Sequence, residues 1–173
     1  LLPVDLQNPE AGEEKFLIGD SIGAAAMLRK IQEKGARATF AVLDASRINP
    51  LSVGLENGLD KLDVPSGVFV LFSAAHGKAA LNELSGSDKN QNSVFMRSFI
   101  PALKTPGLTQ IELAKKVQQG VSAAAAEAGQ EQMPAYDDRF PDLITLNGGS
   151  PEVMVEEKIP LGNAGAAAPA EAG

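Results

Sequence analysis

The sequence predicts an α/β domain whose mostly parallel sheet is covered by helices on both faces. Two short apolar runs, residues 39–43 (TFAVL) and 68–72 (VFVLF), have the composition of strands that are buried on both faces. Segments with helical spacing precede the first run and follow the second, so helices and strands alternate along the chain. With 173 residues, the chain is long enough for one domain with a sizeable core.

Three helices are predicted from apolar spacing and end signals. The first covers residues 21–34, where apolar side chains recur every three or four positions before a glycine. The second covers residues 93–103, with Pro101 marking or kinking its end. The third begins at Thr109, which has Glu112 three positions later, the pattern of a capping box.

The remaining segments are predicted to be a functional loop, a last strand and a tail. Residues 46–66 form a long stretch without a periodic pattern, and long loops in compact domains often have a function. A short final strand is expected over residues 143–146. Residues 150–173 are rich in Ala, Gly, Pro and Glu, which predicts a weakly structured tail or linker.

Composition excludes several classes of function. The net charge of -7 argues against nucleic acid as a partner and favours a site that attracts cationic side chains. The chain has no cysteine, so it has no disulfide and no thiolate metal site, and either the cytoplasm or the periplasm is compatible with it. No apolar run approaches the roughly 20 residues that span a bilayer, so we expect a soluble protein that does not bind membranes. The chain lacks an initiator methionine and a signal-peptide pattern, which suggests a fragment or a processed chain.

Polar residues follow both predicted strands. Asp44 and Ser46 come directly after the first strand, and Ser73, Ala74 and His76 come directly after the second. Sites in open α/β sheets gather at the carboxyl ends of the strands. The sequence therefore predicts a site where these two strands end.

Several motifs around this site, in a fixed order along the chain, are similar to those of a known family. Residues 42–50 (VLDASRINP) are similar to the caspase-homologue signature in which a buried strand ends in Asp-Ala-Cys-Arg, commonly followed by Asn-Pro. Residues 1–5 (LLPVD) resemble the segment that follows the family's catalytic histidine. Other matching segments follow in the family's order: residues 65–74, residues 92–99, residues 106–117 and the Gln-x-Pro-x-Tyr motif of residues 132–136. Together they cover nearly all of residues 1–147 and resemble the bacterial caspase-like proteins, the orthocaspases or metacaspase-like proteins.

The resemblance implies a caspase-like three-layer fold and hydrolysis of peptides after Arg or Lys. The caspase-like domain would be residues 1–149, followed by the tail of residues 150–173. It would divide into the end of the large-subunit part (1–50), the intersubunit loop (47–66) and the small-subunit part (67–149). The family's first strands and its His-Gly pair would lie outside this chain, and another chain or another copy could supply them.

The resemblance also implies roles for individual residues. Ser46 stands where the family has its nucleophilic cysteine, and a serine hydroxyl is much less acidic than a thiol, so we expect an inactive protease. Asp44 would pair with the Arg or Lys of a peptide or protein substrate, beside Ser73 and Ala74. Asn82 stands where a second acid is expected, so the attraction for a cation would be weaker than with two carboxylates.

Two alternatives to an inactive cysteine protease remain open. His76 could act as the base for Ser46 in a serine hydrolase, because adjacent strands lie about 4.8 Å apart. Alternatively, the chain is a pseudoprotease that binds peptides or proteins without chemistry. For single residues, Ser46 could be a small polar residue at a strand end and Asp44 a carboxylate that holds loop amides.

No cofactor and no metal site is predicted from the residues themselves. Some metacaspases use calcium, so calcium is implied by family analogy alone. Asp88, Asp137 and Asp138 are the candidate ligands, and their spacing does not match a regular calcium loop.

Overall fold

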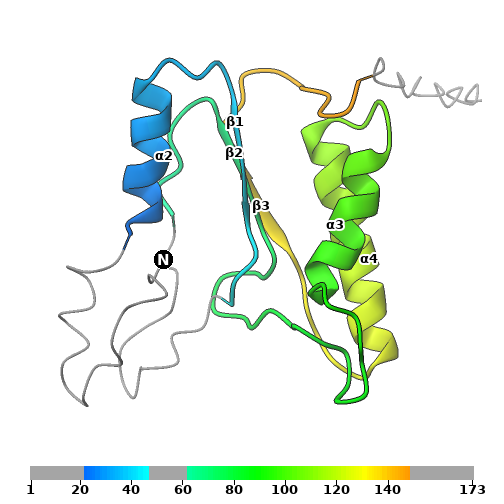
Figure 1. Ribbon diagram of the computed structural model, residues 1–173. Coiled ribbons are helices and arrows are strands. Elements are labelled where there is room, and N and C mark those ends of the chain that lie inside the picture. The colour runs from blue at the N-terminus through cyan, green and yellow to red at the C-terminus, as the bar shows by residue number, and fades with distance from the viewer. Residues whose placement is uncertain (1–21, 47–61, 149–173) are drawn as a thin grey trace, which may run out of the picture.

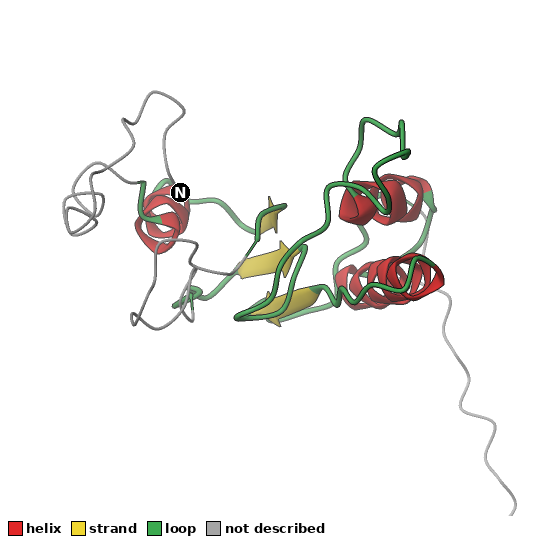
Figure 2. Ribbon diagram, turned by 90° about the horizontal axis from the view of Figure 1, so that it is seen from below, coloured by secondary structure: helices red, strands yellow, loops and turns green. Residues whose placement is uncertain are grey.

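The computed structural model describes residues 22–46 and 62–148, so the predictions for the tail and for most of the long loop lie outside the described residues. The elements follow in the order α2 (Ala24–Glu33), β1 (Thr39–Leu43), β2 (Val68–Phe72), α3 (Val94–Lys104), α4 (Gln110–Glu127) and β3 (Ala135–Asp138) (Figure 1). They form three layers: α2 lies on one side of the sheet, and α3 and α4 lie together on the other (Figure 2). The predicted α/β fold with helices on both faces is confirmed.

The sheet has the order β1-β2-β3. β1 and β2 are parallel with Thr39 opposite Val68 and Leu43 opposite Phe72, so both strands end at the same edge. β2 and β3 are antiparallel, and Ala135 at the start of β3 lies opposite Phe72 at the end of β2. The described sheet is therefore mixed. The reason is the helix pair between β2 and β3, because α3 and α4 run in opposite directions and bring the chain back to the edge where β2 ends.

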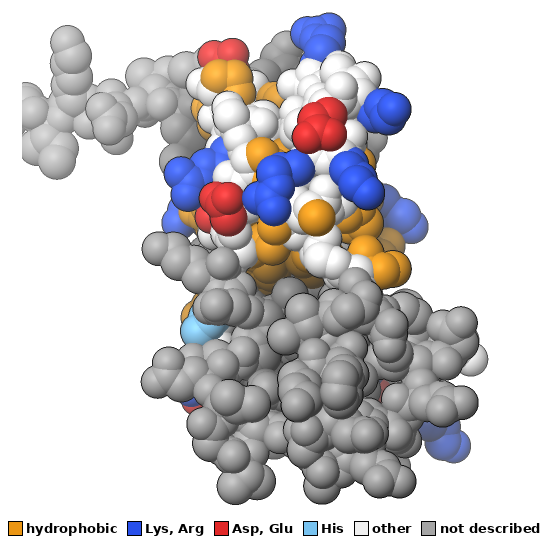
Figure 3. Space-filling view, turned by 90° about the vertical axis from the view of Figure 1, so that its left-hand side faces the viewer, with side chains coloured by type: hydrophobic (Ala, Val, Ile, Leu, Met, Phe, Trp, Pro, Cys, Tyr) orange, Lys and Arg blue, Asp and Glu red, His pale blue; other side chains and the backbone are white. Residues whose placement is uncertain are grey.

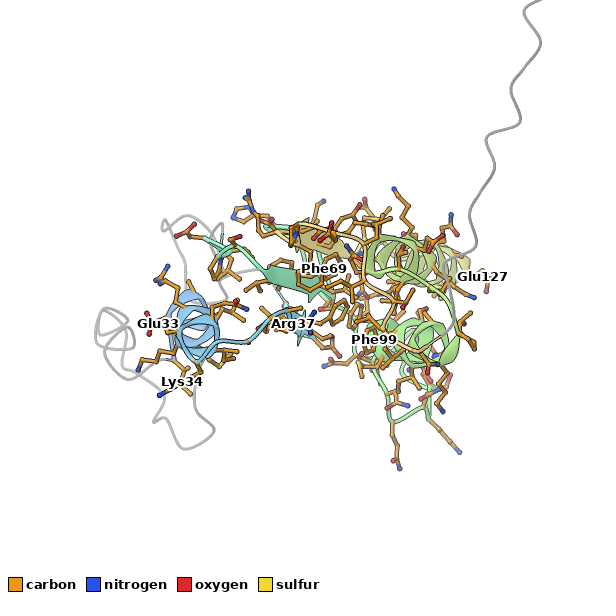
Figure 4. The ribbon with its side chains drawn as sticks, turned by 90° about the horizontal axis from the view of Figure 1, so that it is seen from above. Glu33, Lys34, Arg37, Phe69, Phe99 and Glu127 are labelled. Atoms are coloured by element: carbon orange, nitrogen blue, oxygen red, sulfur yellow. The ribbon has the colours of Figure 1, made fainter. Side chains whose placement is uncertain are left out.

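The core lies on both faces of the central strand. All five residues of β2 are buried, whereas those of β1 are half-buried. Phe69 stacks on Phe40 of β1 at 4.8 Å and on Tyr136 of β3 at 5.6 Å between ring centroids, on the same face as Phe99 of α3 (Figure 4). The opposite face packs against Leu28 of α2. The prediction of a strand buried on both faces is thus confirmed for β2. It is wrong for β1, whose residues are half-buried because β1 lies at an edge of the described sheet.

The helix ends agree with the sequence patterns in most details. α2 is shorter than predicted and begins after Gly23. α3 begins after Ser93, whose hydroxyl accepts the Met96 N–H at 3.0 Å, and Pro101 lies inside the helix instead of ending it.

The capping box of α4 is present as predicted. The Thr109 N–H donates to Glu112 Oε2 at 2.8 Å, and Thr109 Oγ1 accepts the Glu112 N–H at 3.3 Å. The first of these bonds stabilises the ionised carboxylate and lowers the pKa of Glu112.

The strand predicted over residues 143–146 is wrong. In that segment, Thr145 forms a single bridge with Thr109, and Ile144 is tied to Gln110 through backbone and side-chain hydrogen bonds. Residues 135–138 form the third strand instead, because Tyr136 packs against Phe69 of the central strand.

Candidate functional site

The carboxyl ends of β1 and β2 lie side by side, as the sequence predicted. The Ser73 N–H donates to the Leu43 carbonyl at 2.9 Å, which extends the parallel pairing to the last residue of β1. The segment after Leu43 carries Asp44 and Ser46, and the segment after Ser73 carries His76. The structure therefore brings the candidate residues to one edge of the sheet.

Ser46 is exposed, and its hydroxyl is bound to the loop that follows β2. Ser46 Oγ accepts the Ala80 N–H at 3.0 Å and donates to the Ala80 carbonyl at 3.4 Å. Within the described residues, the Ser46 hydroxyl thus forms two hydrogen bonds, both with the backbone of Ala80 and neither with His76. His76 is exposed in the turn that precedes Ala80, and the Ser46–His76 dyad stays a prediction.

Ser73 is fully buried and supports the bend that carries Ser46. Its hydroxyl accepts the Ala45 N–H at 3.0 Å and donates to the Ala45 carbonyl at 3.2 Å. Ala74 is also fully buried. Both residues are buried directly after β2, and their role in substrate binding stays a prediction.

Asp44 is exposed and is tied to the start of α3. Its Oδ2 accepts the Ser93 hydroxyl at 2.6 Å, and the same hydroxyl accepts the first-turn N–H of Met96. Asp44 thus holds a helix-capping hydroxyl in this structure, while its exposure leaves it accessible to a ligand. Asn82 is exposed in the loop between β2 and α3.

Sequence reasoning did not identify Gln132 as part of the site. This residue is 2% exposed, donates from Nε2 to the Ser73 carbonyl at 2.8 Å and accepts the Leu81 N–H at 3.0 Å through Oε1. Its place in the Gln-x-Pro-x-Tyr motif was the one signal in the sequence. No signal in the sequence indicated the contact between the Ala80 backbone and Ser46, because any residue can supply a peptide N–H.

The candidate calcium ligands are engaged in protein contacts. The N–H groups of Leu84 and Asn90 and the Arg97 guanidinium, whose Nη1 lies 2.6 Å from Asp88 Oδ2, hold the pKa of Asp88 at about 2. Asp137 pairs with Arg139 at 2.9 Å. Asp138 accepts the Phe140 N–H and a side-chain hydrogen bond from Gln110. In the described part of the chain, no three acidic or histidine side chains lie close enough together to bind a metal ion.

A second surface feature lies on the outer side of α2, away from this site. The side of the molecule shown in Figure 3 carries lysine and arginine side chains beside hydrophobic ones. A shallow groove here is lined by Ile22, Met27, Ile31, Lys30 and Lys34. None of the helices described is both long and apolar enough to cross a membrane.

Two comparisons with known proteins found matches. The family model described as Caspase domain matches residues 2–143. Among solved structures, caspase-1 from Spodoptera frugiperda is similar, with a TM-score of 0.44 and 18% identity over 62% of this chain and 46% of that chain. The chain thus spans less than half the length of that caspase. No curated protein matches. Because the family model covers most of its length, this chain belongs to the caspase domain family.

Proposed function

We propose that this domain is a homologue of caspase-type cysteine endopeptidases that binds peptides through an Arg or Lys side chain and does not cleave them. Its motifs favour the metacaspase-like branch found in bacteria. The observation that carries the proposal is the bend after β1, which exposes both Ser46 and Asp44 at the shared end of two parallel strands. In this proposal, Ser46 takes the nucleophile's place and Asp44 takes the place of the residue that binds the substrate cation.

The contacts of Ser46 support a lack of turnover. In acyl transfer, a base removes the nucleophile's proton, the nucleophile attacks the peptide carbonyl, and backbone N–H groups stabilise the oxyanion. The hydroxyl of Ser46 donates to the Ala80 carbonyl, which is not a base. A serine without a well-placed base is a weak nucleophile, so the domain is expected to bind peptide without hydrolysing it.

The surroundings of Asp44 support binding of a cation. Its carboxylate is exposed, and Ser93 fixes one oxygen at 2.6 Å, so the group is held in a defined orientation. A guanidinium can form charge-assisted hydrogen bonds with such a carboxylate, and these are stronger than neutral ones. Asn82, which stands where a second acid is expected, adds no charge, so we expect a preference for Arg and Lys with modest affinity.

A peptide-binding titration tests the proposal. A fluorescein-labelled peptide with one central arginine is compared by anisotropy with the same peptide carrying citrulline, which has almost the same shape and no charge. The arginine peptide should bind about tenfold more tightly, which corresponds to about 1.4 kcal/mol for a charge-assisted contact.

Two variants decide whether Asp44 causes this preference. Asp44→Asn should remove it, while Asp142→Asn, a change at an exposed aspartate outside the site, should leave it intact. Equal binding of the two peptides, or a preference that survives Asp44→Asn, would refute the assignment.

A second function, a partner-binding module that has lost the family's chemistry, is favoured by the backbone contacts that occupy the Ser46 hydroxyl. The variant S46C separates the two. If the cleft keeps the geometry of an endopeptidase, the introduced thiol should react with peptide electrophiles, and a module with a remodelled cleft should not react. Labelling of the unmodified protein by a fluorophosphonate would instead support a Ser46–His76 hydrolase.

A further inference from the structure

Gln132 connects the two segments that form the candidate site. On one side, its Nε2 donates to the Ser73 carbonyl at 2.8 Å, and the Ser73 hydroxyl in turn binds both backbone groups of Ala45. Ala45 directly precedes Ser46. The glutamine therefore supports the bend after β1 through one intermediate residue.

On the other side, Gln132 supports the loop after β2. Its Oε1 accepts the Leu81 N–H at 3.0 Å, and the preceding residue, Ala80, supplies both backbone groups that bind the Ser46 hydroxyl. The two sides meet at Ser46. The contacts thus close into a ring of hydrogen bonds, and Gln132 is the residue that joins its halves.

The glutamine is itself held by α4. The Ser122 hydroxyl donates to the Gln132 carbonyl at 3.2 Å, and Gln118 Nε2 donates to the Pro134 carbonyl at 2.8 Å. Both donors belong to a helix whose inner face is in the main core. The ring is therefore anchored to a rigid element.

An amide is the side chain that suits this place. One end must donate to a carbonyl and the other must accept an N–H, and the side chain is 2% exposed, so water cannot replace a lost partner at low cost. A carboxylate keeps the acceptor and loses the donor. A methionine has a similar length and loses both.

We propose that Gln132 is a positioning residue for the reactive position, because it sets the distance between Ser46 and the Ala80 N–H. The inference rests on the proposed function only in taking position 46 as the reactive place. We therefore expect Gln132 to affect the reactivity of the side chain at position 46, although Gln132 itself bonds to Ser73 and Leu81.

The test uses the absence of cysteine from the chain. S46C introduces a single thiol, and its rate of alkylation by iodoacetamide is measured against pH. With the ring intact, the Ala80 N–H donates to the thiolate and stabilises it. Adding Gln132→Met should shift the pH profile to higher pH and slow the reaction at pH 7 by about threefold to tenfold, because this donor is no longer held in place.

A matched control separates positioning from general destabilisation. Gln110 is also a buried glutamine, at 1% exposure, and its amide contacts Asp138, Asp142 and Ile144, away from the ring. Gln110→Met in the S46C background should lower the melting temperature and leave the alkylation profile unchanged. An unchanged profile in Gln132→Met, or an equal shift in both variants, would overturn the inference.

Two features keep the result interpretable. Gln132→Glu provides a second variant if Gln132→Met does not fold, since it keeps an acceptor for the Leu81 N–H and loses the donor to Ser73, so the same shift is expected. Alkylation needs no peptide. Failure of peptide binding would therefore refute the proposed function and leave this test valid.

Discussion

Replacing Ser73 by alanine tests how the bend after β1 is held. Ser73 is fully buried, and its hydroxyl makes both of its hydrogen bonds with the backbone of Ala45, at 3.0 and 3.2 Å. The substitution Ser73→Ala removes one oxygen atom and leaves the backbone conformation of the strand end accessible. Its effect therefore reports these two contacts and little else.

The expected loss of stability follows from the contacts. Each hydrogen bond contributes about 0.5–1.5 kcal/mol net, so their sum is about 1–3 kcal/mol. Because Ala45 is half-buried, water can partly replace the lost partner, which favours the lower half of this range. For a chain of 173 residues, a loss of about 1–2 kcal/mol should lower the melting temperature by about 2–8 °C.

Urea denaturation gives the measurement. The chain has one tyrosine and no tryptophan, so the fluorescence of Tyr136, which stacks on Phe69, reports unfolding of the core. Circular dichroism at 222 nm provides the second probe. Ser66→Ala is the matched control, since Ser66 is exposed in the turn before β2, at the opposite end of the strand. If Ser73→Ala and Ser66→Ala unfold at the same urea concentration, the Ser73 hydroxyl does not hold the bend.

Three further predictions concern the scaffold. Thr109→Ala removes the capping box with Glu112 and should lower the free energy of unfolding by about 1 kcal/mol, measured by urea denaturation, and an unchanged midpoint would contradict the assigned cap. Phe69→Ala opens a cavity beneath three stacked or tilted rings and should cost about 3–5 kcal/mol in the same assay; a loss below about 1 kcal/mol would mean that this ring is not central to the core. Hydrogen bonds from the loop N–H groups and Arg97 lower the pKa of Asp88 from 3.8 to about 2, so its contribution to stability is present above pH 3.8 and is lost as the pH falls through about 2. Asp88→Asn should therefore lower stability at pH 6 and show a smaller decrease between pH 4 and pH 2, and parallel curves for both proteins would refute the assignment.

The elements that depend on local patterns could be predicted from the sequence. The run VFVLF has the composition of a strand covered on both sides, and β2 is buried along its whole length. The Thr109 and Glu112 spacing fixed the start of α4. Placing Asp44, Ser46, Ser73 and His76 at one sheet edge needed only the rule that parallel strands end together.

The features that depend on tertiary contacts could not be predicted. Residues 135–138 (AYDD) carry two carboxylates and lack an apolar run, and they form a strand because Tyr136 stacks on the central Phe69. Residues 143–146 (LITL) have a stronger strand pattern but lie beside the start of α4, where they form a single bridge. Local propensity is overridden in both places by packing.

In the candidate site, too, local patterns could be read from the sequence and tertiary contacts could not. The sequence identified the candidate side chains but not what holds them. Gln132 lies 59 residues from Ser73, and its hydrogen-bond partners are backbone atoms, whose identity leaves no trace in the sequence. The contact between Ser46 and Ala80 has the same character.

We propose that position 46 lies in a caspase-type site that accepts a basic residue. The most direct measurement is the rate at which S46C is alkylated by a peptidyl chloromethyl ketone ending in arginine, followed by intact mass. S66C carries an exposed thiol at the opposite end of β2 and is the control. We expect S46C to react about tenfold faster than S66C and to prefer arginine to citrulline in the reagent, because the site would orient the electrophile toward the thiol. Equal rates for the two thiols, with no preference for arginine, would contradict it.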